Sequence, residues 1–241
     1  MRLDILLAQA HISRKKMKQA LLKKKILVDD CPARKLSQNV DTGLQTITLE
    51  EQPVLGKPHQ YFMMNKPLGV VTANSDAKFQ TVLELIRPED FSEDLYSVGR
   101  LDRDTSGLLL ITDNGPLGFQ LLYPQYHVTK TYKVEVNGPL DDQAVQSFQK
   151  GIVFLDGTSC KPATLTIHSS SSNKSSATVT ISEGKFHQIK KMFLTVGVKV
   201  TSLKRTHFGD FELNPNLATG EYRVLNQAEL EIVRHYLEKS Y

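Results

Sequence analysis

A dense polar cluster lies between Gly99 and Gly107 and is followed directly by the apolar run Leu108 to Ile111. It contains two carboxylates, Asp102 and Asp104, with an arginine on either side of Asp102. This order predicts a tight loop anchored by a strand that is buried on both faces. Neighbouring arginines favour an ionised carboxylate, which on a rigid support can act as a nucleophile or a base. A salt-bridged connector in front of a core strand explains the same pattern equally well, because structural ion pairs are common.

Two further side chains are placed by the periodicity of their surroundings. Residues 130–136 alternate between apolar and polar types, so the predicted strand points Tyr132 toward the core. In a later predicted helix, Lys190 lies nearer the apolar face than Lys191 does, which makes Lys190 the better candidate to pair with a carboxylate. A core tyrosine and two solvated lysines are the simpler explanations of these patterns.

Composition predicts a globular protein with room for one large domain, or for one domain and a small module. The chain has 241 residues, of which 40% are hydrophobic and 23% charged. It has no apolar run of about 20 residues and no signal-peptide pattern, so we expect a cytoplasmic protein without a membrane segment. Its two cysteines, Cys31 and Cys160, have no partner pattern, which predicts neither a disulfide framework nor a metal site.

The positive charge is concentrated at the start of the chain. Residues 1–50 contain ten Lys/Arg and five Asp/Glu, a net charge of +5, whereas the remainder has 20 and 21, a net charge of −1. Such asymmetry favours a basic module that meets a polyanion, most often nucleic acid, although a solvated lysine-rich helix face is the alternative. The expected phosphate contacts are Arg14, Lys15, Lys18, Lys23 and Lys24.

The N-terminal segment resembles the αL RNA-binding module of small-subunit ribosomal protein four. The resemblance is carried by Met1-Arg2-Leu3-Asp4, Ser13-Arg14-Lys15 and Ile26-x-Val28-Asp29. The module often has glycines where Lys23 to Lys25 and Asp30 stand here, so we expect a different turn geometry. Residues 50–59, with two prolines and a glycine, are the predicted linker. The predicted domains are therefore a basic αL RNA-binding module with its linker at 1–58 and a catalytic domain at 59–241.

The remaining elements predict the fold class. A short helix is expected at 81–86, and two strands, 163–167 and 177–181, are expected to flank a serine-rich loop at 168–176. Strands and helices alternate irregularly, and the strands alternate in polarity. This organisation predicts an α+β core with a mixed, largely antiparallel sheet.

Several motifs, in a fixed order, resemble those of the RsuA-like pseudouridine synthases of small-subunit (16S) rRNA. They are Asn65-Lys66-Pro67-x-Gly69, Gly99-Arg100-Leu101-Asp102-x-Asp104-Thr105-Ser106-Gly107-Leu108, Lys130-Thr131-Tyr132, the segment 182–193 with Leu203-x-Arg205, and Gly220-Glu221-Tyr222-Arg223. Together with the N-terminal module, this resemblance covers nearly the whole chain. It implies the pseudouridine synthase fold and the isomerisation of one uridine in rRNA without a cofactor.

The resemblance also implies roles for individual residues. Asp102 is the essential carboxylate, Lys190 its compensating cation, Tyr132 a ring that stacks on the target base, and Leu203 a wall of the pocket. The target base must swing out of folded RNA, and Arg100, or Arg103 beside it, would fill the gap or hold phosphate. Further RNA contacts are expected from Arg103, Lys191 and Arg205.

Particular sequence features distinguish the predicted pseudouridine synthase from alternative functions. An RNA-binding ribosome-assembly factor is disfavoured, because it has no need for an aspartate, an inward tyrosine and a half-buried lysine together. A pseudouridine synthase that acts on large-subunit rRNA remains an alternative function. A glycoside hydrolase using Asp102 and Asp104 is disfavoured because carboxylates two residues apart are poorly placed to flank one sugar. Cysteine spacing excludes a zinc deaminase. The expected partner is small-subunit rRNA or an assembling ribosomal particle, and the expected state is a monomer.

Overall fold

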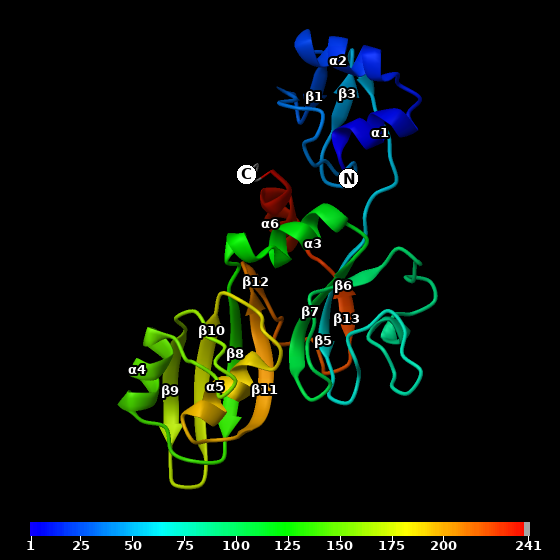
Figure 1. Cartoon of the computed structure of the whole chain (residues 1–241). Helices are drawn as coiled ribbons and strands as arrows, with labels where there is room; N and C mark the ends of the chain where they lie inside the picture. Colours follow the sequence, from blue (N-terminus) through cyan, green and yellow to red (C-terminus); the bar gives the residue numbers. More distant parts are fainter. Residues whose placement is uncertain (239–241) are drawn as a thin grey trace. The chain divides into compact units, whose positions relative to one another are not determined.

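The computed structural model describes residues 1–238, and its contacts group the chain into two compact units (Figure 1). Unit 1 consists of Met1–Phe62, Ile111–Leu121 and the described residues from Val224 onward. Unit 2 consists of Met63–Leu110 and Leu122–Arg223. Each unit therefore combines segments that are far apart in the sequence. The division of the chain into an RNA-binding module and a catalytic domain at residue 58 stays a prediction.

Unit 1 begins with two helices and a small sheet of strand order β2-β1-β3-β4. The elements are α1 (Leu3–Gln9), α2 (Arg14–Leu22), β1 (Ile26–Val28), β2 (Cys31–Pro32), β3 (Ile47–Leu49) and β4 (Gln52–Pro53). Leu3, Leu6 and Met17 from the helices pack with Ile26 and Ile47 from the sheet in one buried cluster. Ser13 caps α2, because its hydroxyl accepts a hydrogen bond from the Lys16 amide at 3.3 Å.

The turns of this module correct two expectations from the sequence. Lys24 and Asp30 have φ angles of 54° and 63°, so they adopt the left-handed conformation that glycine favours. The predicted linker is also shorter than expected, because β4 lies inside it and pairs with β3. Whether the segment is an αL-type RNA-binding module stays a prediction.

Two helices from later in the chain complete unit 1, namely α3 (Gly115–Leu122) and α6 (Gln227–Glu238). Arg234 of α6 bonds to Asp29 at 2.6 Å, and Gln45 bonds to Glu238 at 3.4 Å. A buried hydroxyl, Tyr61, is held between the Asp41 carboxylate and the Asn114 amide. These bonds tie the basic N-terminal segment to α6 and to the start of α3.

Unit 2 contains most of a nine-stranded sheet of order β13-β5-β7-β11-β8-β10-β9, with β12 paired to β11 and β6 to β7. The strands are β5 (Tyr61–Lys66), β6 (Tyr96–Val98), β7 (Ser106–Thr112), β8 (Lys130–Val136), β9 (Thr164–Ser170), β10 (Ser175–Ile181), β11 (Val200–Phe208), β12 (Phe211–Glu212) and β13 (Tyr222–Val224). β7 and β11 are parallel, whereas β8, β10, β9 and β12 pair antiparallel to their neighbours. The predicted α+β class with a mixed, largely antiparallel sheet is confirmed.

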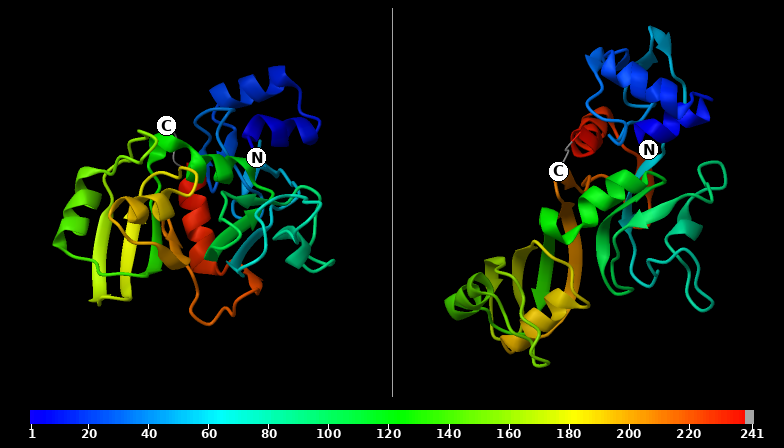
Figure 2. Two further views of the ribbon diagram at one scale, coloured as in Figure 1. Left: turned by 60° about the horizontal axis from the view of Figure 1, so that its bottom comes forward. Right: turned by 45° about the horizontal axis from the view of Figure 1, so that its top comes forward.

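Helices α4 (Asp142–Lys150) and α5 (Gln188–Thr195) accompany this sheet. α4 packs against β9 at one end of the strand order, and α5 packs against β11 (Figures 1 and 2). The Asp141 carboxylate caps α4 by accepting from the Ala144 amide at 3.0 Å. One apolar cluster joins these helices to β8, β10 and β11, and Phe148 and Phe193 are fully buried in it.

Two expected elements of unit 2 differ in the structure. The helix expected at 81–86 is a 3-10 turn, η1 (Leu83–Leu85), and a second such turn is η2 (Pro124–Tyr126). The serine-rich loop is much shorter than expected, because β9 and β10 run through most of it. Serine hydroxyls there find partners: Ser169 bonds to Ser176 at 2.7 Å, and buried Ser175 donates to the Gly138 carbonyl at 2.6 Å. Paired hydroxyls make these residues compatible with a strand.

Candidate active site

The loop that holds Asp102 is anchored at its C-terminal end by β7. Residues 107–112 of this strand are all buried, which confirms the strand expected to be buried on both faces. Gly107 has a φ angle of +103°, and a Cβ atom there would meet the Arg205 carbonyl oxygen at 2.2 Å. Glycine is therefore required where β7 and β11 approach each other at the base of the loop.

A buried ammonium holds the two ends of the loop together. Lys66 Nζ donates to the carbonyl oxygens of Pro67, Asp102 and Thr105 at 2.9, 3.2 and 3.0 Å. The side chain is fully buried, and this burial lowers the pKa of Lys66 to about 8. Three charge-assisted hydrogen bonds at the end of β5 therefore determine the backbone path on both sides of Asp102.

The Asp102 side chain faces an ammonium group from α5 and an imidazole ring from the residue before this helix. Lys190 Nζ lies 2.8 Å from the Asp102 carboxylate, and His187 Nε2 lies 3.7 Å from it. Lys190 also bonds to Asp104, the second carboxylate of the loop. The side chain of Lys190 is 23% exposed and that of Asp104 is 72% exposed. Lys190 therefore pairs with a carboxylate as predicted, whereas Lys191 pairs with a different one, Asp156.

Charge interactions outweigh burial at this cluster. Burial acts to lower the pKa of Lys190, but hydrogen bonds from its ammonium to Asp102 and Asp104 raise it overall. Burial likewise acts to raise the pKa of Asp104, but the hydrogen bond and charge of Lys190 lower it overall. The loop therefore carries ionised groups at neutral pH, which is the state required of a carboxylate that acts as nucleophile or base.

Tyr132 points into the core, as its alternating strand predicted, and is 7% exposed. It shares one buried cluster with Leu203 of β11 and with Leu101, the residue before Asp102. In the β8–β11 pairing, Tyr132 lies opposite Arg205. This arrangement places an aromatic ring with a polar hydroxyl among apolar residues next to the carboxylate loop, as a pocket for a flat heterocyclic base would need.

The prediction that Arg205 contacts RNA is contradicted, because its side chain is 1% exposed. Its Nε donates to the Leu108 carbonyl at 2.8 Å, and Tyr132 lies opposite it on β8. Burial lowers the pKa of Arg205, whereas the interaction with Tyr132 acts in the opposite direction. Arg205 is buried where β11 pairs with β7 and β8, so it can interact with Tyr132 but cannot reach a phosphate on the surface.

Of the other basic residues expected at the site, Arg100 and Arg103 are exposed and Lys191 is partly buried. Arg100 lies on the surface next to the loop, and the Arg103 guanidinium lies 4.3 Å from the centre of the Phe79 ring. Lys191 pairs with Asp156 at 3.3 Å. In unit 1 the predicted phosphate contacts are all exposed, namely Arg14, Lys15, Lys18, Lys23 and Lys24. Their roles in RNA binding stay predictions.

Sequence reasoning missed Lys66 and His187 as site residues. Both lie inside motifs that had been noted, Asn65-Lys66-Pro67 and Phe186-His187-Gln188. Lys66 could have been found from its position at the end of an apolar strand, because a lysine buried there must have polar partners. His187 gave no comparable signal, since its approach to Asp102 depends on its left-handed backbone at the start of α5, where φ is 53°.

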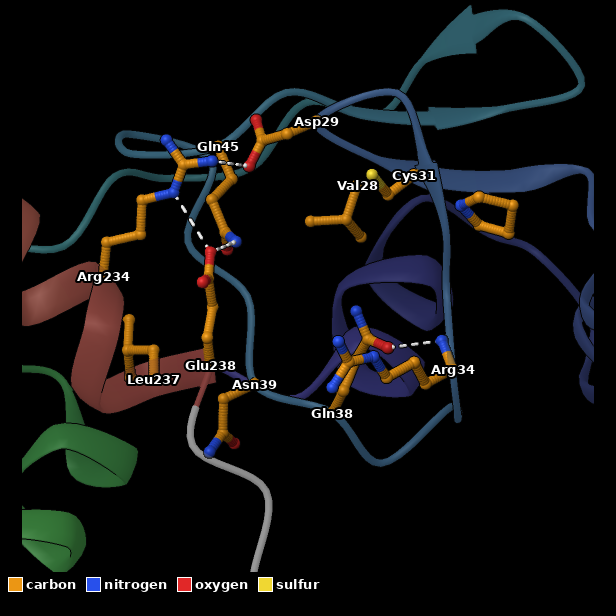
Figure 3. Close-up of a pocket in the computed structure, with 11 residues that line it drawn as sticks. Val28, Asp29, Cys31, Arg34, Gln38, Asn39, Gln45, Arg234, Leu237 and Glu238 are labelled. Carbon is orange, nitrogen blue, oxygen red and sulfur yellow. Dashed lines mark hydrogen bonds and ion pairs between the residues drawn. The ribbon is translucent and has the colours of Figure 1, made fainter.

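A cavity of about 310 Å³ lies elsewhere, in unit 1 (Figure 3). Asp29 and Gln45 of the N-terminal segment line it together with Arg234 and Glu238 of α6. The Arg234 side chain reaches both Asp29 and Glu238, so the charged groups of this cavity are largely paired with one another. None of the side chains expected to do chemistry lines it.

Comparison with known proteins places this site in a family. Residues 60–195 match the RNA pseudouridylate synthase family, and the chain belongs to that family. The chain is 39% identical to the uncharacterized RNA pseudouridine synthase YtzG of Bacillus subtilis, over 97% of this chain and 98% of that protein. It is 36% identical to ribosomal small subunit pseudouridine synthase A of Yersinia pestis, with the same coverage of each chain.

Further relatives agree. The Escherichia coli K12 ribosomal small subunit pseudouridine synthase A is 38% identical over 72% of this chain and 74% of its own length. A crystal structure of a pseudouridylate synthase superposes with a TM-score of 0.67 at 32% identity, covering 97% of this chain and 99% of that one. The protein is therefore an isomerase of the pseudouridine synthase class that acts on RNA. Within residues 1–238, no helix is long and apolar enough to cross a membrane.

Proposed function

We propose that this protein converts a uridine of small-subunit ribosomal RNA to pseudouridine, with Asp102 as the acting carboxylate. The observation that carries the proposal is the pairing of Asp102 with Lys190 on a loop that buried Lys66 anchors. The relatives named ribosomal small subunit pseudouridine synthase A support this choice of substrate, because they resemble the chain over both units.

The reaction breaks the bond between uracil N1 and ribose C1′ and forms a bond between uracil C5 and the same carbon. The proton on C5 is lost and N1 gains one, so no oxidant, reductant or cofactor is needed. An ionised carboxylate beside the nucleotide can attack C1′, add to the base or remove a sugar proton. In each case Lys190 would orient the Asp102 carboxylate through their 2.8 Å bond.

The apolar pocket beside Asp102 would receive the uracil. Tyr132 would stack on the base, and Leu203 would line the pocket, because both are buried in one cluster with Leu101. Arg205, which lies opposite Tyr132 on the neighbouring strand, would help to position the Tyr132 side chain. A pocket with these walls retains the detached uracil while it turns, since a flat apolar surface permits rotation in its plane.

The target base must leave the RNA stack to enter this pocket, and unstacking costs a few kcal/mol. Arg100, exposed beside the loop, would fill the vacated space or hold a phosphate. Arg103 and Lys191 would add phosphate contacts near the site. The exposed basic face of α2, with Arg14, Lys15 and Lys18, would hold the RNA independently of its sequence.

The test is to incubate the protein with unmodified small-subunit rRNA, free and in assembling particles. Pseudouridine is then mapped by carbodiimide-dependent primer-extension stops. We expect one new stop with the wild-type protein and none with Asp102→Asn, while Asp104→Asn, altered two residues away, retains the stop. Large-subunit rRNA treated in parallel is the substrate control. A stop only in large-subunit rRNA would overturn the substrate, and full activity of Asp102→Asn would overturn the role of Asp102.

A further inference from the structure

An exposed pair of stacked rings lies at the edge of the active site. The rings of Phe186 and His187 are 3.8 Å apart between centroids and 20° from parallel. Phe186 is 66% exposed, which is unusual for so large an apolar side chain, and the side chain of His187 is 41% exposed. Exposed aromatic surface of this kind is typical of a binding site.

The backbone beneath the pair is held in an uncommon conformation. His187 is the N-cap residue of α5 with φ 53° and ψ 30°, yet its side chain does not cap the helix. Such a left-handed conformation is unfavourable for a residue other than glycine, and it persists only where neighbours hold it. Here buried Gln188 does so, because its side chain bonds to Glu183 at 2.8 Å and to the Lys185 amide at 2.9 Å.

The consequence of this conformation is the position of the rings. The His187 side chain does not cap α5. Its Nε2 atom lies 3.7 Å from the Asp102 carboxylate, and its ring stacks on the ring of Phe186. Only the His187 ring therefore separates the Phe186 ring from Asp102. Lys191 Nζ lies 6.0 Å from the centre of the Phe186 ring and supplies a positive charge beside it.

We propose that Phe186 is a stacking platform for the unpaired nucleobase of a nucleotide next to the target uridine, with His187 as its backing ring. Proteins that hold single-stranded RNA combine aromatic faces with nearby cations in this way. The inference rests on the proposed function, because it assumes that the target uridine lies at Asp102. Phe186 is a positioning residue: by holding the neighbouring base outside the stack, it keeps the target nucleotide extended toward the pocket.

The first test uses a fluorescent reporter, since the chain contains no tryptophan. Phe186→Trp and, as the matched control, Leu155→Trp at a residue that is 91% exposed, are each combined with Asp102→Asn to prevent turnover. Unmodified small-subunit rRNA that the wild type modifies is the titrant. We expect strong quenching at position 186 and little at 155, because a stacked base quenches indole. Equal quenching at both positions, or none at 186 while the RNA is bound, would overturn the proposal.

The second test separates binding from catalysis. Removing one base–aromatic stack costs about 1–3 kcal/mol, so Phe186→Ala should raise KM by about 5- to 150-fold with kcat changed less than threefold. Phe186→Tyr should restore the wild-type KM, and Leu155→Ala should leave it unchanged. An unchanged KM for Phe186→Ala, or an equal rise for Leu155→Ala, would overturn stacking. Loss of wild-type activity on this RNA would instead overturn the proposed substrate.

Discussion

Lys190 Nζ bonds to both Asp102 and Asp104, so one ammonium from α5 serves two carboxylates of the same loop. The two acids would otherwise repel each other, and the shared cation joins the loop to α5. Lys190 is 23% exposed, so water screens this interaction only in part.

Lys190→Gln should therefore reduce kcat/KM by about 10- to 100-fold. Charged hydrogen bonds contribute about 1.5–3 kcal/mol, and each 1.4 kcal/mol corresponds to a factor of ten. Single-turnover pseudouridine formation is the measurement. The control is Lys174→Gln, whose partner Glu135 lies outside the loop and which should change the rate less than threefold. Equal losses in the two variants would show that general positive charge, rather than pairing with Asp102, matters.

Lys66 predicts a pH dependence of stability. Burial lowers the pKa of Lys66 in the folded state to about 8, against an ordinary lysine value of 10.5. Between these values the unfolded state binds more protons than the folded state, so the contribution of Lys66 to the unfolding free energy rises with pH. Below pH 8 both states are protonated, and this contribution is at its lowest.

The unfolding free energy of the wild type minus that of Lys66→Met should therefore increase between pH 7.5 and 10. The expected shift is about 1–3 kcal/mol, since one pKa unit corresponds to about 1.4 kcal/mol. Urea denaturation at several pH values measures it. Lys16→Met, at an exposed position paired with Glu50, is the control and should show no such trend. A difference that falls with pH would contradict the lowered pKa.

The position of Arg205 opposite Tyr132 predicts coupling between two buried side chains. Tyr132→Phe removes the hydroxyl that interacts favourably with the buried guanidinium, which costs about 1–3 kcal/mol of unfolding free energy. In an Arg205→Met background the same substitution should cost less than about 1 kcal/mol, because no guanidinium remains to be satisfied. Denaturation of the four proteins of this cycle is the measurement. Equal costs in both backgrounds would mean that the two residues do not interact.

The backbone conformation of Gly107 and its close approach to β11 predict that position 107 tolerates no side chain. Gly107→Ala would place Cβ 2.2 Å from the Arg205 carbonyl oxygen at a φ of +103°, so we expect the variant to lose more than about 3 kcal/mol or to fail to fold. The matched control is Gly115→Ala in α3, where a Cβ meets nothing within 4 Å and alanine favours the helix. Thermal unfolding compares the two. A normal melting temperature for Gly107→Ala would contradict the close approach of β7 and β11.

The basic face of α2 predicts salt-dependent RNA binding. Replacing Arg14, Lys15 and Lys18 by glutamine should weaken binding and reduce the slope of log K against log salt by about 2–3, since each lost phosphate contact removes about 0.7–0.9. Lys174→Gln, which removes a lysine paired with Glu135 in unit 2, should leave the slope unchanged. Filter binding at several salt concentrations measures both. An unchanged slope in the triple variant would argue for a solvated helix face.

Point substitutions are preferable here to deletion of residues 1–58, because that segment packs with the rest of unit 1. Deleting it would remove Asp41 from the buried Tyr61 hydroxyl and Asp29 from Arg234. A deletion would therefore mix loss of RNA contacts with loss of stability.

The sequence by itself determined which side chains point inward and which motifs stand together. Alternation in 130–136 predicted an inward Tyr132, helical periodicity predicted the half-buried Lys190, and the order of motifs predicted the family. These patterns are local, because the direction of a side chain repeats every two residues in a strand and every 3.6 in a helix.

Only the tertiary structure decided which groups meet. Arg205 is buried because β11 pairs with β7 and β8, whose residues lie far from it in the sequence. Lys66 bonds across the Asp102 loop, and the N-terminal segment joins α6, for the same reason. Whether a charged side chain contacts RNA or is buried among carbonyls depends on which distant strand lies opposite it, and periodicity does not contain that information.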